Sequence, residues 1–286
     1  MSKRLLSALA FALVLVGLPS EASAAVIHVR PGPNALSRAI HRADPGDRLV
    51  IHGGRYREEI VVGKRLSLVA AAGDTPTIDA TCDSLTAVDV SANGVLLRGL
   101  RVVGGTYYEV DSKFVGNVAL RHIRMRDTCG NALYGVNVYR SGPVLVARSR
   151  ASGFEDAGMY VGGISDGPVT LWRNTTFDNN RGILIEDVDP NTVRVGNNIS
   201  RANDLPGLGQ PSGIWLNAAA GVEVVGNAFT ANDDYGIDID TDSSNNEVRG
   251  NTAMGNGTLD IRDRGTGNCF SDNVYGTSVP ATLPPC

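Results

Sequence analysis

Aromatic and acidic side chains recur at one place in a short pattern, x-Gly-apolar-x-apolar, that occurs five times in this chain of 286 residues. Between the two apolar residues stand Asn137, Tyr160, Leu184, Trp215 and Asp238. Aromatic rings stack on sugar rings, and carboxylates accept hydrogen bonds from hydroxyls, bind cations or transfer protons. This combination is typical of a surface that holds an extended carbohydrate.

A second set of outward positions follows two residues later in each repeat, because side chains alternate between the two faces of a strand. The set comprises Tyr139, Gly162, Glu186, Asn217, Asp240 and Arg262, and we expect Asp260 to extend the first set. Neighbouring strands lie about 4.8 Å apart and residues i and i+2 about 6.6 Å apart. Both sets are therefore expected to share one surface.

Four of these side chains are candidates for catalysis: Asp238, Asp240, Glu186 and Arg262. Elimination or C5 epimerisation of a uronan needs a base for the C5 proton and a positive charge beside the sugar carboxylate. Calcium bound by Asp238 and Asp240, or by Asp242 or Glu186, would supply that charge. The base or clamp would be Arg262, Lys113 or Arg181. Substrate binding is expected of Tyr139, Tyr160, Trp215, Asn217 and Lys113.

Two further functions fit the same surface. Asp238 and Asp240, about 6.6 Å apart along one strand, match the carboxylate spacing of an inverting glycoside hydrolase. Alternatively, the chain is a non-catalytic carbohydrate-binding or cell-surface protein. Residues 104–117, which include Lys113, and residues 205–211 are expected to be loops beside this surface. Ca²⁺ is the cofactor that these predictions include, and an extended polysaccharide is the partner.

The elements that position these side chains follow from an internal repeat. Six similar segments begin at Val118, Val144, Val169, Val193, Val222 and Asn246, in steps of 24 to 29 residues. This period is typical of a β-solenoid with three short strands per coil, and we expect seven or eight coils. The apolar positions then stack into two buried ladders, from Val136 to Ile237 and from Val138 to Ile239.

Asparagine recurs five residues into successive coils, at Asn174, Asn198, Asn227, Asn251 and Asn273. Asparagine adopts left-handed backbone angles readily, and its amide can bond to the coils above and below. We therefore expect a stack of inward-facing asparagines at one turn of the solenoid.

The stretch from Asn34 to Val62 resembles the opening of the pectate-lyase-like right-handed parallel β-helix proteins, in which a short helix covers the open end of the coils. Here the helix would span residues 35–43, followed by the turns Pro45-Gly46-Asp47 and Gly54-Arg55-Tyr56. The resemblance implies an all-β fold, a single-stranded right-handed parallel β-helix (β-solenoid) with a short N-terminal capping helix. The fold hosts many activities, and this sequence lacks the Gly-His-Gly, Asp-Pro-His and Trp-Ile-Asp-His motifs of its enzyme branches.

The N-terminus resembles a secretory signal peptide: Lys3 and Arg4 precede an apolar run, and a small-x-small site ends at Ala24. We expect residues 1–24 to be removed, leaving one β-helix domain over residues 25–286 in a secreted protein, extracellular or periplasmic. The net charge of −4 gives no reason to expect nucleic acid or a membrane as a partner of the cleaved chain. We also expect a monomer.

An even number of cysteines in an exported chain indicates disulfides. The chain has Cys82, Cys129, Cys269 and Cys286. Three pairings are possible, and proximity in sequence favours Cys82 with Cys129 and Cys269 with Cys286.

Overall fold

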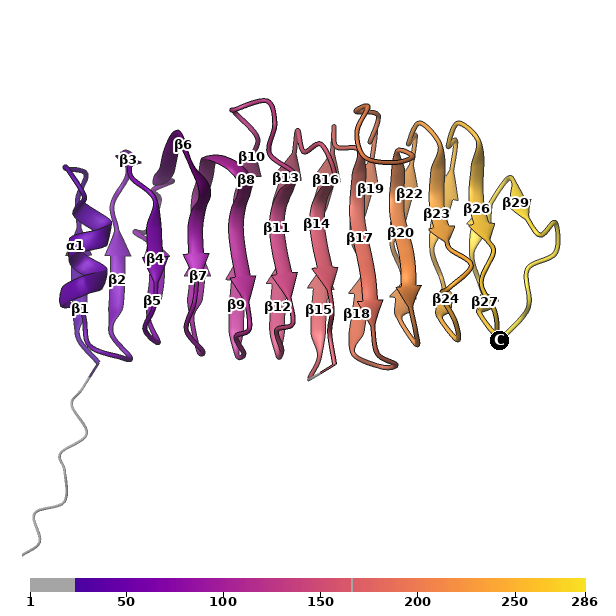
Figure 1. The fold of residues 1–286 in the computed structure, drawn as a ribbon, viewed down its shortest axis with the longest axis horizontal. Coiled ribbons are helices and arrows are strands. Elements are labelled where there is room, and N and C mark those ends of the chain that lie inside the picture. The colour runs from indigo at the N-terminus through magenta and orange to yellow at the C-terminus, as the bar shows by residue number, and fades with distance from the viewer. Residues whose placement is uncertain (1–23, 166) are drawn as a thin grey trace, which may run out of the picture.

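The chain winds into a parallel β-solenoid in which each coil contributes one short strand to each of three sheets (Figure 1). The computed structural model describes residues 24–165 and 167–286. The predicted signal peptide lies outside the described residues apart from Ala24. Every strand pair is parallel, and neighbours in a sheet come from successive coils.

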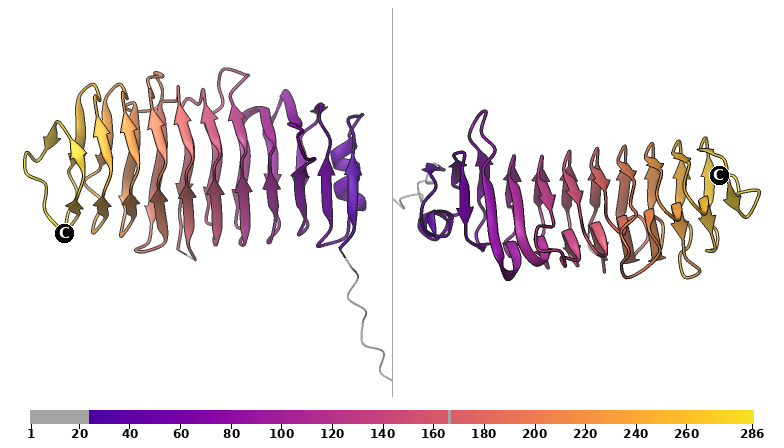
Figure 2. Two further views of the ribbon diagram at one scale, coloured as in Figure 1. Left: turned by 180° about the vertical axis from the view of Figure 1, so that it is seen from behind. Right: turned by 90° about the horizontal axis from the view of Figure 1, so that it is seen from above.

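The first sheet has 11 strands and runs the length of the solenoid (Figure 2). Its strands are β1 (Val26–Val29), β2 (Arg48–Ile51), β5 (Ser67–Ala70), β7 (Leu96–Arg98), β9 (Val118–Arg121), β12 (Val144–Ala147), β15 (Val169–Trp172), β18 (Val193–Gly196), β21 (Glu223–Val225), β24 (Glu247–Arg249) and β27 (Cys269–Ser271). The solenoid therefore has about ten coils, and the predicted seven or eight was too low. The first coils carry neither the x-Gly-apolar-x-apolar pattern nor the repeated asparagine, so the repeat was not visible there.

The second and third sheets complete each coil. The second sheet contains β3 (Arg55–Arg57), β10 (Arg124–Arg126), β13 (Arg150–Ser152), β16 (Thr175–Phe177), β19 (Ile199–Arg201), β22 (Ala228–Thr230), β25 (Thr252–Met254) and β28 (Val274–Tyr275). The third contains β4 (Ile60–Val62), β11 (Tyr134–Tyr139), β14 (Ala157–Gly162), β17 (Arg181–Val188), β20 (Ser212–Ala219), β23 (Tyr235–Ile239), β26 (Leu259–Asp263) and β29 (Ser278–Val279). Two long strands, β6 (Thr77–Val90) and β8 (Arg101–Lys113), turn the corner from the second sheet into the third.

The predicted apolar ladders form the core. Val136, Met159, Ile183, Ile214, Ile237 and Ile261 lie in register on the third sheet and are fully buried. The ladder from Val138 to Ile239 is equally buried. Burial of apolar surface, worth about 25 cal/mol per Å², fixes the register, because a one-residue slip would turn every apolar side chain outward.

The predicted asparagine stack is confirmed. In each step the side-chain oxygen of one asparagine accepts bonds from the backbone and side-chain N–H groups of the asparagine one coil earlier, as Asn198 does from Asn174 at 2.8 and 3.0 Å. A second stack, not predicted, lies five residues later and comprises Asn179, Asn203, Asn232 and Asn256. Both stacks supply hydrogen bonds to buried turns that have no ladder of their own.

Helix α1 (Ala35–Arg42) covers the first coil, as predicted, and buries Leu36, Ala39 and Ile40. The carboxylate of Glu58 accepts hydrogen bonds from the backbone N–H groups of Leu36 and Ser37 at 3.0 and 2.9 Å. It thereby satisfies donors that the first helical turn leaves free.

Both disulfides pair as sequence proximity favoured, Cys82 with Cys129 and Cys269 with Cys286. The second ties the C-terminal residue to strand β27. The segment 104–117, expected to be a loop, is instead mostly strand β8. Residues 205–211 form a loop, as predicted.

Candidate functional site

The outward side chains of the third sheet share one surface, as predicted. Tyr160 pairs with Leu184, Leu184 with Trp215, and Trp215 with Asp238 on successive strands. We call this line the first outward row and the line two residues later the second outward row. The second row contains Tyr139, Gly162, Glu186 and Asn217 in register, and Lys113 on β8 begins it beside Tyr139.

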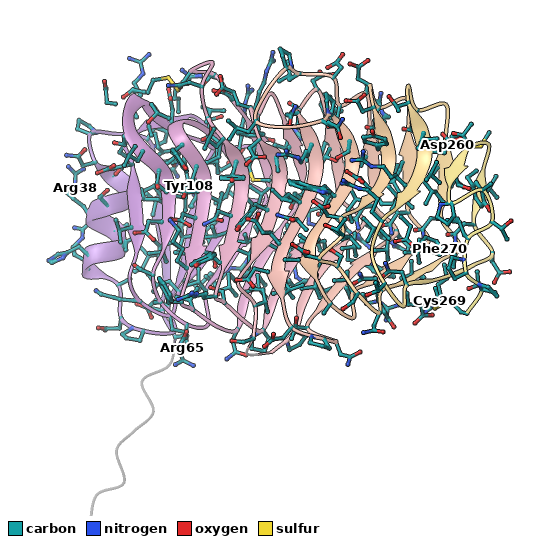
Figure 3. All side chains as sticks on the ribbon, turned by 45° about the vertical axis from the view of Figure 1, so that its right-hand side comes forward. Arg38, Arg65, Tyr108, Asp260, Cys269 and Phe270 are labelled. Atoms are coloured by element: carbon teal, nitrogen blue, oxygen red, sulfur yellow. A yellow bond between two sulfur atoms is a disulfide. The ribbon has the colours of Figure 1, made fainter. Side chains whose placement is uncertain are left out.

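One part of the predicted arrangement is wrong. Arg262 lies beside Asp238 in the first outward row, whereas the sequence analysis placed it in the second row beside Asp240. Asp260 faces elsewhere: its carboxylate accepts bonds from Asn256 and from the backbone N–H groups of Gly276 and Thr277, at the end of an asparagine stack. Figure 3 labels Asp260 near the C-terminal end of the solenoid.

Aromatic rings occupy the middle of this surface. The ring centroids of Tyr134 and Tyr160 are 4.9 Å apart, and the rings of Tyr108 and Tyr134 are stacked at 5.8 Å. Tyr134, Tyr139 and Trp215 pack against a buried group formed by Tyr160, Leu184 and Ala157. Tyr108, which Figure 3 labels, marks the N-terminal limit of the aromatic group. Mutual packing holds the rings in fixed orientations.

Glu186 links the two outward rows. Its oxygens accept hydrogen bonds from the hydroxyl of Tyr160 at 2.9 Å and from Nδ2 of Asn217 at 2.7 Å. Burial, reinforced by the negative charge of Glu186, raises the pKa of Tyr160 well above its usual range. Tyr160 therefore stays protonated at neutral pH and acts as a hydrogen-bond donor, not as a base.

A buried ion pair supports Trp215 from one side. Arg181 pairs with Asp156, and the hydroxyl of Tyr134 donates to the same carboxylate at 2.6 Å. The guanidinium of Arg181 lies 4.4 Å from the centroid of the Trp215 ring, a cation–π contact that fixes the indole.

The C-terminal part of the surface is an ion-paired group. Asp238, 4 % exposed, receives two hydrogen bonds of 2.7 Å from Nε and Nη2 of Arg262. The same guanidinium stacks on Tyr235, 3.8 Å from the ring centroid. Asp240 pairs with Arg264 at 3.1 Å. The structure thus brings Asp238, Asp240 and Arg262 together, with both oxygens of Asp238 already bonded.

The N-terminal part holds a second polar group. Asp111 accepts from Asn137 at 2.7 Å and pairs with Lys113 at 2.9 Å. The ammonium of Lys113 also lies 4.2 Å from the centroid of Tyr108. Asp89 is the register partner of Asp111, and burial together with the charge of Asp111 raises the pKa of Asp89. Two carboxylates and one half-exposed cation therefore meet at this end.

A cavity of about 480 Å³ lies beside the second outward row and is lined by Phe114, Arg140, Gly163, Ile164, Ser165, Asp187 and Asp189. Phe114 meets Tyr139 edge to face, with centroids 6.0 Å apart, and Arg140 lies 5.2 Å from the same ring. The cavity therefore extends the aromatic surface toward the adjoining turns.

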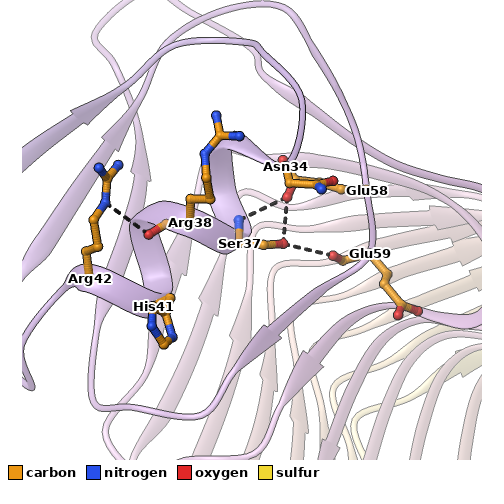
Figure 4. A pocket seen from close by; sticks show the side chains of 7 residues that line it. All are labelled: Asn34, Ser37, Arg38, His41, Arg42, Glu58 and Glu59. Carbon is orange, nitrogen blue, oxygen red and sulfur yellow. Dashed lines mark hydrogen bonds between the residues drawn. The ribbon is translucent and has the colours of Figure 1, made fainter.

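A cavity of about 660 Å³ lies against helix α1 and contains Ser37, His41 and Glu58 (Figure 4). These residue types can form a catalytic triad, but no hydrogen bond joins His41 to either partner among the described side chains. The carboxylate of Glu58 is bonded to the helix N-terminus and to the hydroxyl of Ser37 at 2.6 Å. Its role is structural, and the site does not lie here.

The side chains that most often bind metals do not cluster within the described residues 24–165 and 167–286. All four cysteines are in disulfides, and the part of the chain that the structure describes contains no group of three or more His, Cys, Asp or Glu that could hold a metal. His28 and His52 approach with Nδ1 and Nε2 3.0 Å apart, and Asp74 lies 3.6 Å from the other nitrogen of His52. This pair is remote from the third sheet.

Several residues of this surface were given no role from the sequence, chiefly Asp89, Asp111, Tyr134 and Arg264. Asp89 and Asp111 continue the first outward row by two coils. Extending the row backward in steps of about one coil would have found them. Arg181, a candidate base or clamp from the sequence, is paired with Asp156 beside the Trp215 ring, so its charge is already neutralised within the chain.

Solved structures share this fold at low sequence identity. A pectate lyase, Pel9A, matches with a TM-score of 0.70 and 14% identity, covering 92% of this chain and 82% of that chain. The A-module of the Azotobacter vinelandii mannuronan C-5 epimerase AlgE4 matches with a TM-score of 0.58 and 15% identity, covering 84% and 71%. These matches confirm the predicted right-handed parallel β-helix of the pectate-lyase-like type.

A protein whose description names no enzyme activity also shares the fold. The N-terminal fragment of bacteriophage Phi29 gene product 12 matches with a TM-score of 0.63 and 12% identity, covering 84% of this chain and 49% of that chain. No curated protein sequence matches the chain significantly. Residues 85–282 match the family model described as periplasmic copper-binding protein (NosD). Because this match spans well over half of the chain, the chain belongs to the NosD family.

Proposed function

We propose that this protein binds an extended polysaccharide along the outer surface of the third sheet. The observation that carries the proposal is the run of aromatic side chains on five of six successive coils: Tyr108, Tyr134, Tyr160, Trp215 and Tyr235. With strands about 4.8 Å apart the run extends over roughly 24 Å. A surface of this length contacts several sugar rings. The partly exposed rings of Tyr108, Tyr134 and Trp215 are available for stacking, whereas Tyr160 and Tyr235 are buried.

Polar groups on both sides of the aromatic run support the proposal. Lys113 and Arg264, with side chains 35% and 38% exposed, place an ion-paired cation at each of the two ends. Glu186 and Asn217 hold each other in place between them. Fixed polar groups around an apolar centre are the usual composition of ligand sites, because they orient the ligand without losing side-chain entropy.

Replacement of Trp215 by alanine tests the proposal. Loss of one stacked ring should weaken binding of oligogalacturonate or another oligosaccharide by roughly 1–3 kcal/mol, measured by isothermal titration calorimetry. Trp172→Ala is the matched control, because Trp172 lies on the first sheet. Equal losses in both variants, or no loss in Trp215→Ala, would contradict the proposed surface.

Uronan lyase or C5-epimerase activity is a second candidate, favoured by the pairing of Asp89 and Asp111 beside Lys113. In this arrangement the ammonium of Lys113 would neutralise the uronate carboxylate, Asp111 would take the C5 proton, and Asp89 would protonate the leaving O4. The test is incubation with pectate, alginate and glycosaminoglycans, with and without calcium. Unsaturated ends indicate a lyase, and an altered uronate ratio indicates an epimerase. The absence of both products would contradict this candidate.

The catalytic roles of Asp238, Asp240, Glu186 and Arg262, and calcium binding by the two aspartates, stay predictions. Arg262 lies where a cation bound by Asp238 would lie. Reducing ends formed without unsaturation would support the third candidate, an inverting hydrolase that uses Asp238 and Asp240.

The family description implies copper, but the described residues do not fit a copper site of three or more protein ligands. Cysteine thiolates are used in disulfides, and the histidine pair offers two nitrogens at most. No step of the proposed function involves copper.

A location outside the cytoplasm agrees with the two disulfides and with the periplasmic family. Within residues 24–165 and 167–286, no helix is long and apolar enough to cross a membrane. Export through the N-terminal 24 residues stays a prediction.

A further inference from the structure

Seven arginines gather on the second sheet, on the adjoining ends of first-sheet strands and on the corner between the two sheets. Arg101, Arg124 and Arg150 are register partners on β8, β10 and β13, which lie side by side in Figure 1. Arg98 is likewise paired with Arg121 on the first sheet. We call the group the arginine strip; its members, all exposed, are Arg98, Arg101, Arg121, Arg124, Arg126, Arg148 and Arg150.

The arginine strip has no countercharge of its own. Among the described residues, none of the seven guanidinium groups forms an ion pair within 4.0 Å, although Arg181, Arg262 and Arg264 on the third sheet all do. Like charges on neighbouring strands repel, by about 1 kcal/mol per pair at 4 Å in water. The chain has 30 acidic against 26 basic residues, so the missing countercharge reflects placement and not composition.

Two cavities make the strip concave. One of about 330 Å³ is lined by Asp74, Thr75, Gly99, His122, Arg124, Arg148 and Arg150. The other, of about 380 Å³, shares Arg124, Arg150 and Thr75 with the first and adds Arg101 and Arg126. Because they share these residues, the two cavities adjoin, and we call them together the groove; five of the seven arginines line it.

Two other groups in this groove leave most of its positive charge in place. Burial, reinforced by Arg148, Arg98 and Arg121, lowers the pKa of His122, so its imidazole is neutral at neutral pH and can donate a hydrogen bond. Asp74 is the one carboxylate among the described residues of the lining, and its Oδ2 accepts a hydrogen bond from the backbone N–H of Gly53 at 2.9 Å. Its single negative charge offsets only part of the charge of the five arginines that line the two cavities.

We propose that the arginine strip is a binding groove for an acidic polysaccharide, separate from the aromatic surface of the third sheet. Guanidinium groups bind carboxylate or sulfate through paired hydrogen bonds. A ladder of arginines about 4.8 Å apart suits a polymer that presents one acidic group per short repeat. Nucleic acid fits less well, because single-strand binding needs interleaved aromatic rings and the groove is lined by one, Phe177, over which Arg201 already lies at 5.8 Å.

The test compares Arg124→Gln/Arg150→Gln with the matched control Arg194→Gln/Arg249→Gln. The control removes two first-sheet arginines, the exposed Arg194 and the partly exposed Arg249, each paired with a glutamate. It changes the net charge equally. Both pairs are introduced into the Trp215→Ala background, so that the outcome does not depend on the third-sheet proposal. Binding of pectate and of dextran sulfate is measured by calorimetry at low and moderate salt, after circular dichroism confirms the fold.

We expect the strip variant to bind pectate, dextran sulfate or both at least tenfold more weakly than the Trp215→Ala parent, and the control to stay within twofold. The polymer that shows the larger loss identifies carboxylate or sulfate as the preferred group. Equal weakening in strip variant and control, absence of binding by the parent, or tighter binding of single-stranded DNA than of both polysaccharides would overturn the proposal.

Discussion

Asn198→Ala is expected to lower the free energy of unfolding by roughly 3–5 kcal/mol. The Asn198 side chain is 1 % exposed and makes four hydrogen bonds. Its removal leaves the backbone N–H of Asn174 without its acceptor and takes one donor from the carbonyl of Leu171. A buried group left unpaired costs about 1–3 kcal/mol. Urea unfolding measured by circular dichroism gives the difference.

Asn131→Ala is the control for this experiment, because Asn131 is exposed and lies in a turn. We expect it to stay within about 0.5 kcal/mol of wild type. A loss below about 1 kcal/mol in Asn198→Ala would show that water or a shift of neighbouring coils replaces the amide, and that the asparagine stack is not an important source of stability.

Stability should fall as the pH rises from about 5 to 8, by roughly 3 kcal/mol through one carboxyl group. Glu109 is fully buried, and burial raises its pKa to about 8 despite hydrogen bonds from the backbone of Gly104 and Gly105. In the unfolded chain the same group titrates near 4.3. Between these values the folded chain holds a proton that the unfolded chain has lost, so each step up in pH favours unfolding.

Glu109→Gln removes this titration and should flatten the dependence, with stability similar to wild type near pH 5 and higher at pH 8. Glu59→Gln, at an exposed position, should follow the wild-type curve. Parallel curves for wild type and Glu109→Gln between pH 5 and 8 would mean that Glu109 is ionised in the folded chain.

The repeated coils were predictable because their signals are local. Three features recur at nearly constant spacing: the alternation of apolar residues, the glycine before it, and the asparagines Asn174, Asn198 and Asn227. The alternation indicates a strand with one buried face, and the asparagines indicate a stacked turn. The second asparagine stack carried the same signal five residues later, at Asn179 and Asn203, and was overlooked. The first coils lack these markers, so their strands became visible only in three dimensions.

The misplacement of Arg262 has a physical cause. In its coil Asp260 occupies the position that is glycine in the other repeats. Without that glycine, the sequence did not show which of Leu259 and Ile261 is the first apolar residue of the pattern. A shift of two residues keeps apolar side chains inward and polar ones outward, and the alternation cannot detect it. The register shows Ile261 beside Ile237 and therefore Arg262 beside Asp238.

The ion pairs were beyond the reach of the sequence. Which partner Asp238 or Asp156 selects depends on side-chain directions across coils, whereas the sequence defines only which face each residue occupies. The arginine strip was missed for a related reason: its members come from two sheets and a corner, and only their stacking makes them neighbours.

The most direct test of the proposed glycan surface is the fluorescence of Trp215 during titration with oligogalacturonate. Trp172→Phe leaves Trp215 as the sole tryptophan, and the Arg124→Gln/Arg150→Gln background removes binding at the arginine strip. We predict a saturable change in emission whose midpoint equals the calorimetric dissociation constant. Heat of binding without any change in Trp215 emission would place the glycan elsewhere on the molecule and contradict the account.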